Sequence, residues 1–88
     1  MANKQLTPDE EIALLSQEIR NLQADLTADV SPIGDWKLNK VVEYERQGLP
    51  SPYTPEKMSE YYAKRQEARD RINECQDRIK ELEDERNA

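Results

Sequence analysis

The sequence contains no histidine and no phenylalanine, and only two glycines and one cysteine among its 88 residues. Histidine is the side chain that most often serves as a base near neutral pH and as a metal ligand, so its absence removes both roles. No Ser-His-Asp or Cys-His arrangement can form, and Gly34 and Gly48 fit neither of the glycine-rich phosphate-binding motifs. We therefore expect no enzymatic activity, no catalytic residue, no cofactor and no metal site.

Long apolar runs are also missing. No stretch approaches the roughly 18 apolar residues that a membrane-spanning helix needs, and residues 1–6 lack the apolar core of a signal peptide. The single cysteine, Cys75, excludes an intrachain disulfide and a cysteine-based metal cluster. These features predict a cytoplasmic protein with no membrane partner.

Charged residues make up 36% of the chain and hydrophobic residues 35%, and the net charge is −6. An acidic surface repels phosphate backbones, so we expect no direct binding to nucleic acid. Two interpretations of the acidity remain. It keeps a small helical protein soluble, or it lets an acidic helix compete for a basic groove on a nucleic-acid-binding partner.

The last third of the chain predicts one long helix over residues 55–86. Thr54 and Pro55 supply a helix cap followed by proline at the first helical position. Apolar or tolerated core positions then recur at alternating spacings of three and four, which is a heptad pattern. These positions are Met58, Tyr61, Arg65, Ala68, Ile72, Cys75, Ile79, Leu82 and Arg86. Cys75 falls in this pattern, where a thiol packs as a small hydrophobe; a reactive thiol is the alternative.

A first helix is predicted over residues 8–29. Thr7, Pro8 and Glu10 form the sequence of a capping box, and Ser31-Pro32 ends the helix because the residue before proline avoids the α region. The core positions of this helix also alternate by three and four. They are Ile12, Leu15, Ile19, Leu22 and Leu26.

The segment between these helices predicts a short third helix over residues 35–47. Ser31-Pro32 or Asp35 can cap its start, and Gly48 is suited to the left-handed position after its end. Pro50 and Pro52 then favour an extended connector. The chain is thus predicted to be a single all-α domain, residues 1–88.

The two heptad patterns complement each other when the long helices run antiparallel. We predict an antiparallel helical hairpin, coiled-coil-like, with the short helix folding back toward Met58, Tyr61 and Tyr62. Flanking ion pairs are expected between Glu18 and Arg78 and between Asp25 and Arg71. We use "seam" for the predicted hairpin or oligomer core: Ile12, Leu15, Ile19, Leu22, Leu26, Ala68, Ile72, Cys75, Ile79 and Leu82.

This core is thin for a monomer, so self-association or a partner helix is expected. A parallel homodimer through the long helix is the competing arrangement. Arg65, at a core position, allows two interpretations. Its stem extends past Tyr61 or Tyr62 toward water, or it anchors an interface.

Aromatic and lysine side chains concentrate in the middle of the chain. Tryptophan and tyrosine dominate protein–protein hot spots, although the same residues also serve to pack a short helix. The candidate protein-binding surface consists of Trp36, Lys37, Lys40, Tyr44, Tyr53, Tyr61 and Tyr62.

Several short blocks resemble a group of short proteins, without assigned activity, that phages and bacterial prophages encode. The blocks are Ser31-Pro32-Ile33-Gly34-Asp35-Trp36-Lys37, Tyr44, Gly48-Leu49-Pro50-x-Pro52-Tyr53 and Arg65-Gln66-x-Ala68-Arg69-Asp70-x-Ile72-Asn73. The resemblance covers about half of the chain. It implies a small accessory protein in a bacterial or phage-infected cytoplasm and transfers no site residue.

Together these observations favour a non-enzymatic protein that binds another protein. If the resemblance to phage proteins holds, the expected role is to modulate a host factor. The alternative is a structural or assembly component that oligomerises through its long helix. A small-ligand binder requires that oligomerisation build a pocket between subunits.

Overall fold

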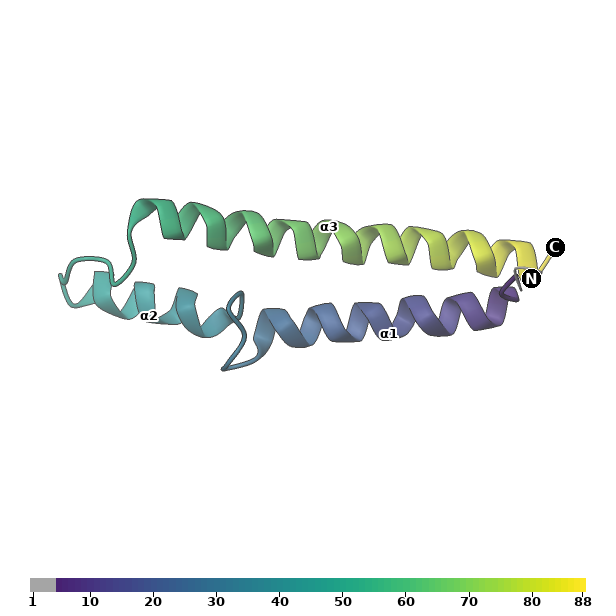
Figure 1. Cartoon of the computed structure of the whole chain (residues 1–88), viewed down its shortest axis with the longest axis horizontal. Coiled ribbons are helices and arrows are strands. Elements are labelled where there is room, and N and C mark those ends of the chain that lie inside the picture. Colours follow the sequence, from purple (N-terminus) through teal and green to yellow (C-terminus); the bar gives the residue numbers. More distant parts are fainter. Residues whose placement is uncertain (1–4) are drawn as a thin grey trace.

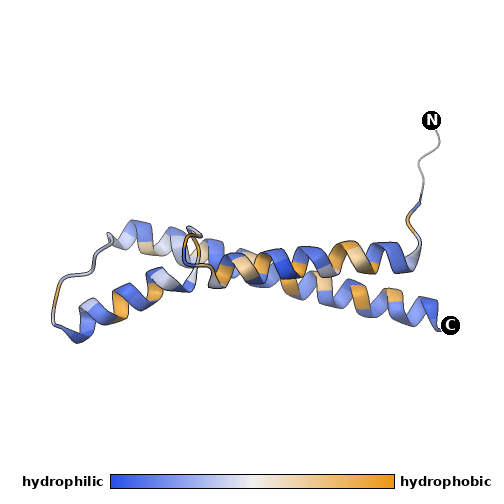
Figure 2. Cartoon of the chain, turned by 90° about the horizontal axis from the view of Figure 1, so that it is seen from below, coloured by the Kyte–Doolittle hydropathy of each residue, from blue (hydrophilic) through white to orange (hydrophobic). Residues whose placement is uncertain are grey.

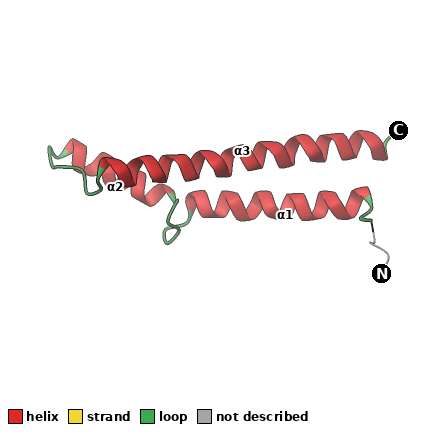
Figure 3. Ribbon diagram, turned by 45° about the horizontal axis from the view of Figure 1, so that its top comes forward, coloured by secondary structure: helices red, strands yellow, loops and turns green. Residues whose placement is uncertain are grey.

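The computed structural model describes residues 5–88, and this part of the chain forms three α-helices and no strand (Figure 3). The helices are α1 (Pro8–Thr27), α2 (Asp35–Arg46) and α3 (Pro55–Arg86). The predicted all-α class is confirmed. Among the described residues, no helix is both long and apolar enough to cross a membrane.

Local capping determines where the two long helices begin. The Thr7 hydroxyl accepts a hydrogen bond from the Glu10 backbone N–H, and the Glu10 carboxylate accepts one from the Thr7 backbone N–H. This is the reciprocal capping box that the sequence predicts. At α3, the Thr54 hydroxyl accepts from the Lys57 backbone N–H and Pro55 takes the first helical position. Both starts therefore lie where the sequence places them.

Helix α1 ends at Thr27, two residues before the predicted end. Ala28 is already extended (φ −69°, ψ 141°), and the Thr27 hydroxyl donates to the carbonyl of Gln23 one turn back. Residues 28–34 then form a turn whose carbonyls are bonded by side chains of α2 and α3, as described below. Helix α1 ends before residue 29 because residues 28 and 29 belong to this connector.

The short helix α2 begins at Asp35 as predicted, but its N-cap and its last residue differ from the prediction. It spans Asp35–Arg46 rather than 35–47, and its N-cap is Gly34 rather than Ser31 or Asp35. Gly48 adopts φ 71°, the left-handed conformation expected of it. Its N–H and that of Leu49 bond the carbonyls of Glu45 and Tyr44, so a Schellman motif closes the helix.

Helix α1 packs along α3 in the opposite direction, with Asp9 close to Arg86 at one end and Leu26 close to Arg65 at the other. Helix α2 follows α1 in line beside the first turns of α3 (Figure 1). The backbones of α2 and α3 stay apart, however, and only side chains join them. The molecule is therefore elongated, with extents of 58 × 30 × 19 Å.

The buried side chains of the α1–α3 pair all belong to α3. Its buried side chains are Tyr61, Arg65, Ala68, Ile72, Cys75 and Leu82. No residue of α1 is buried to the same extent, and its core positions Ile12, Leu15, Ile19, Leu22 and Leu26 all keep some exposure. Figure 2 shows apolar residues along both helices where they pass each other. Packing against α3 therefore covers the apolar residues of α1 on one side only and leaves the other side exposed.

The ion pairs between α1 and α3 are not those expected. Arg71 bonds Glu18, at 2.8 Å from Nε to Oε1, and Arg78 bonds Glu11 at 3.2 Å, so each arginine pairs one heptad away from the predicted partner. Both guanidinium groups also bond a glutamate three residues ahead on α3 (Glu74 and Glu81). They therefore lean toward the C-terminal end of α3. In an antiparallel pair, that direction leads to lower residue numbers on α1.

Candidate protein-binding site

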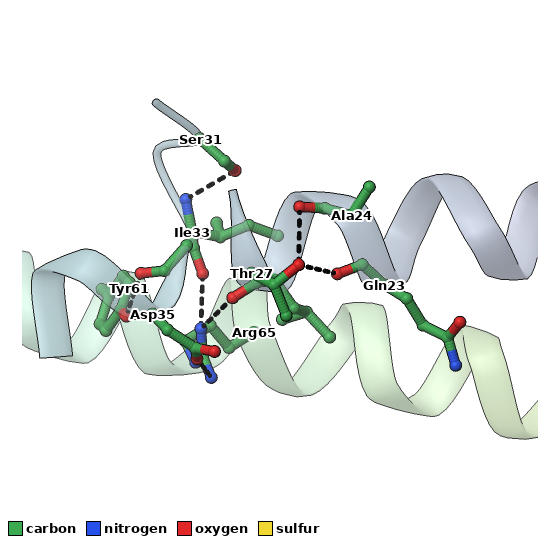
Figure 4. A network of polar contacts seen from close by, with 10 residues as sticks. Gln23, Ala24, Thr27, Ser31, Ile33, Asp35, Tyr61 and Arg65 are labelled. Atoms are coloured by element: carbon green, nitrogen blue, oxygen red, sulfur yellow. Dashed lines mark hydrogen bonds and ion pairs between the residues drawn. The ribbon is translucent and has the colours of Figure 1, made fainter. Parts of the chain in front are cut away.

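A buried arginine holds the α1–α2 connector against α3 (Figure 4). Arg65 Nη1 donates to the carbonyl of Ile33 at 2.7 Å and to that of Leu26 at 3.3 Å. Its Nη2 donates to Asp35 Oδ1 at 2.7 Å. The Arg65 side chain is only 7% exposed, so it does not extend toward water. It turns inward and joins the end of α1 to the start of α2, which neither sequence interpretation describes.

Two aromatic side chains bond the same connector. The Tyr61 hydroxyl donates to the Gly34 carbonyl at 2.7 Å, and Trp36 Nε1 donates to the Ser31 carbonyl at 2.7 Å. The Arg65 guanidinium also lies over the Tyr61 ring, 5.4 Å from its centroid. Buried carbonyls need such partners, and here they come from tyrosine, tryptophan and arginine. Tyr61 and Trp36 therefore have a structural role, because they hold the connector in place.

Two lysines of α2 lie near aromatic rings and form no ion pair with the described residues. Lys37 Nζ is 5.5 Å from the Trp36 ring centroid, 5.6 Å from that of Tyr53 and 5.9 Å from that of Tyr61. Lys40 Nζ lies over Tyr44 and Tyr53 at 5.9 and 5.7 Å. Cations within about 6 Å of ring centroids are attracted by the ring quadrupoles. The rings thus attract both ammonium groups.

A groove of about 340 Å³ opens where α2 and α3 diverge. Ile33, Pro32 and Met58 supply apolar surface to it. Its remaining lining residues are polar or aromatic: Lys37, Tyr53, Lys57, Glu60, Tyr61 and Lys64. We call this feature the lysine groove. It combines an apolar part with three ammonium groups and one carboxylate.

The structure brings together most of the candidate surface residues identified from the sequence. Trp36, Lys37, Tyr53 and Tyr61 meet around the Lys37 ammonium, and Lys40 and Tyr44 join them through Tyr53. Tyr62 differs, since it is 49% exposed, although its ring centroid lies 5.5 Å from that of the buried Tyr61.

The candidate surface from the sequence lacks six residues that line the groove: Pro32, Ile33, Lys57, Met58, Glu60 and Lys64. Lys57, Tyr61 and Lys64 follow the i, i+4, i+7 spacing that places residues on one side of a helix. That spacing could have identified a basic stripe on the first turns of α3. It could not have shown that α2 leaves the stripe uncovered.

Away from this end, Cys75 is fully buried between the helices, and its Sγ donates to Glu18 Oε2 at 3.4 Å. Burial raises the pKa of the Cys75 thiol, and the neighbouring Glu18 carboxylate raises it further. The hydrogen bond from Arg71 lowers the pKa of Glu18. A buried thiol held in its neutral form is a poor nucleophile, so these contacts support the packing role for Cys75.

No protein-family model, curated protein sequence or solved structure matches the chain. The candidate site therefore rests on its geometry alone.

Proposed function

We propose that this chain is a non-enzymatic protein that binds another protein through the end formed by α2 and the first turns of α3. The observation that supports this most directly is the lysine groove, which exposes aromatic, apolar and cationic groups side by side. Tyrosine and tryptophan are typical of residues that contribute strongly to protein–protein binding. An open groove between two helices suits a peptide segment or a helix of a partner.

The finer architecture belongs to the same proposal. We take α1 and α3 to form an antiparallel, coiled-coil-like hairpin that uses the ten seam residues, with α2 as the short third helix. The burial of Ala68, Ile72, Cys75 and Leu82 supports this. Ile72→Asp should therefore unfold the protein, because it places a charge at a buried position. A variant that keeps its circular dichroism spectrum would refute the seam.

The register of the seam has its own test. Cysteines introduced at Leu22 and Ile72, with Cys75→Ser, should form an intrachain disulfide under mild oxidation if these positions share a layer. The single-cysteine variants serve as controls for intermolecular bonds. A double variant that forms only intermolecular disulfides would contradict the proposed register.

The resemblance to phage and prophage proteins adds a context to the proposal: a small accessory protein in the cytoplasm of a bacterial or phage-infected cell that modulates a host factor. A photo-crosslinking amino acid at Lys57, in the groove, should then give one discrete adduct in such a cell. The same amino acid at Lys80, which is also exposed on α3 but lies outside the groove, is the matched control. Equal adducts from both positions, or none from Lys57, would count against a partner at this end.

A second function, that of a structural or assembly component that oligomerises through the long helix, is favoured by the incomplete burial of α1. Its core residues, such as Leu15 and Ile19, keep an exposed side that a second copy could cover. Light scattering across a concentration series separates the two. Mass that increases steadily with concentration favours assembly, and a constant monomer or small oligomer favours the binding function.

A further inference from the structure

We infer that the lysine groove takes an acidic peptide segment that carries an apolar residue, contributed by a partner protein. This inference rests on the proposed function and specifies the chemistry of the partner.

The lysines of the groove form no ion pair in the described part of the chain. Within residues 5–88, every ion pair uses an arginine, and Lys37, Lys57 and Lys64 take part in none. Glu60 is the one acidic residue that lines the groove. Three ammonium groups against one carboxylate leave a local excess of positive charge in a protein whose net charge is −6.

One of these cations is already in place for binding. Lys37 is half-buried and its Nζ lies near the rings of Trp36, Tyr53 and Tyr61, so less side-chain freedom is lost when a carboxylate arrives than for a fully exposed lysine. Lys57 and Lys64 are exposed and lie along one side of α3, about two helical turns apart. Carboxylates spaced along an extended or helical peptide can reach both.

The apolar part of the groove determines which kind of side chain lies between the carboxylates of the bound peptide. Ile33, Pro32 and Met58 supply surface that a purely acidic tail would leave uncovered. A leucine or another apolar side chain in the acidic segment would bury it. This combination distinguishes a peptide from a free anion such as phosphate, which gains nothing from Met58.

The acidity of the rest of the molecule does not prevent this binding. Residues 35–64 carry five acidic and five basic side chains, so the whole net charge of −6 resides in the remainder of the chain. Much of that remainder lies toward the opposite end of a molecule 58 Å long. At physiological salt the Debye length is about 8 Å, so the distant acidic side chains are largely screened.

The test is a titration of the full chain with a short peptide of aspartate, glutamate and leucine, blocked at both ends and labelled for fluorescence anisotropy. Trp36 emission gives a second signal from beside the groove, since Lys37 Nζ lies 5.5 Å from the centroid of its ring. We expect saturable binding. Lys57→Glu and Lys64→Glu should each weaken it about tenfold, because each removes an attraction and adds a repulsion.

Lys80→Glu is the matched control, since it makes the same change of charge at another exposed position of α3 outside the groove. It should alter the affinity less than about twofold. Equal loss from Lys80→Glu would show that only long-range charge matters and would overturn the inference. Equal binding of a peptide with lysine in place of the acidic residues would also overturn it.

Two further outcomes identify other ligands and would also refute the proposal. Displacement of the peptide by millimolar inorganic phosphate would identify an anion site, and tighter binding of a single-stranded oligonucleotide would identify a nucleic-acid site. Failure of the inference is separable from failure of the proposed function. If a crosslinker at position 57 captures a protein in cells while the acidic peptide does not bind, the function stands and only the partner chemistry is wrong.

Discussion

At the scale of single residues, Arg65 contributes most to the shape of the α2 end. A core position of a heptad usually holds an apolar side chain, and an arginine there has to find partners inside the protein. Arg65 finds three partners: the Leu26 carbonyl at the end of α1, the Ile33 carbonyl in the connector and the Asp35 carboxylate at the start of α2. Its planar guanidinium can direct several N–H groups at once, which a lysine ammonium on a flexible stem cannot reproduce in the same geometry.

We therefore predict that Arg65→Lys lowers the free energy of unfolding by about 1.5–3 kcal/mol, the usual value for hydrogen bonds that involve a charged group. Arg69→Lys, at an exposed position of the next turn, should change it by less than about 0.5 kcal/mol. Urea denaturation followed by circular dichroism measures both. Equal stabilities for the two variants would mean that the connector does not depend on the guanidinium.

The cluster of Glu18, Arg71 and Cys75 predicts how stability changes with pH. The pKa of Glu18 lies below its ordinary value of 4.5, so the bond to Arg71 contributes fully above pH 4.5 and is lost as the pH falls through the lowered pKa. The pKa of Cys75 lies above its ordinary value of 9.0. The neutral thiol therefore favours the folded state below pH 9.0, and this contribution is lost as the pH rises through the raised pKa.

Melting temperatures across the pH range should consequently form a plateau between these limits. Glu18→Gln should weaken the dependence on the acid side, and it should also lower the pKa of Cys75, because the carboxylate that raises it is gone. Alkylation of the thiol against pH measures the second effect. Glu67→Gln, an exposed glutamate of α3, is the control, and an acid dependence as steep in Glu18→Gln as in the parent would contradict the assignment.

At the scale of elements, the two glycines end and begin helices for different reasons. Gly48 has φ 71°, and a Cβ there would meet open space, so only backbone strain opposes a side chain. Gly34 has an ordinary φ of −71°, but a Cβ there would overlap the Ala28 carbonyl oxygen and lie 2.9 Å from Trp36 Cδ1. One position needs glycine for its conformation and the other for its lack of a side chain.

From this we predict that Gly48→Ala costs about 1 kcal/mol, whereas Gly34→Ala costs about 1–3 kcal/mol through overpacking. The Gly34 variant should also shift the connector and weaken the bond from Tyr61 to the Gly34 carbonyl. Urea denaturation gives the energies, and Trp36 fluorescence reports the connector. Gly34→Ala without effect on either measurement would mean that the close approach to Ala28 is not needed.

The elements also show what the sequence could and could not predict. The starts of α1 and α3 depend on hydrogen bonds within three residues, between Thr7 and Glu10 and between Thr54 and Lys57, so local sequence was enough. The end of α1 and the N-cap of α2 depend on Arg65 and Tyr61, which lie tens of residues away in the chain. Spacing could place Arg65 near the core, but it could not give the direction of its side chain.

Spacing also could not give the partners of the ion pairs between α1 and α3, because they depend on the direction of long side chains. Heptad positions predict that Arg71 and Arg78 lie beside acidic residues of α1, which is true. Each arginine lies between two acidic positions one heptad apart, and the choice depends on which way a long side chain leans. Contacts to Glu74 and Glu81 decide that direction, and pairing rules between helices do not include them.

At the scale of the whole molecule, the chain is far from spherical. Its radius of gyration is 18.2 Å over Cα atoms, whereas a compact chain of this length would have about 12 Å. Three helices arranged as one long layer produce this difference, because α2 extends the line of α1 and does not fold across the pair (Figure 1).

This shape predicts the result of small-angle X-ray scattering. A monomer should give a radius of gyration near 18 Å, slightly larger with its hydration layer. A dimer that covers the exposed side of α1 should double the mass but raise the radius only modestly, because the copies lie side by side. A dimer joined end to end should raise it far more. A monomeric value near 12 Å would show that α2 folds back onto the other helices in solution.

Finally, the start of α1 and the end of α3 lie together at one end of the rod, where Asp9 bonds Arg86, and the lysine groove lies toward the other end. Anything attached at either of those points, whether a surface, a bead or a fused domain, would leave the groove pointing outward over much of the 58 Å length of the molecule. Copies anchored next to one another would then display their grooves as a parallel array. Even weak individual contacts would gain avidity from such an array when the target carries repeated acidic segments.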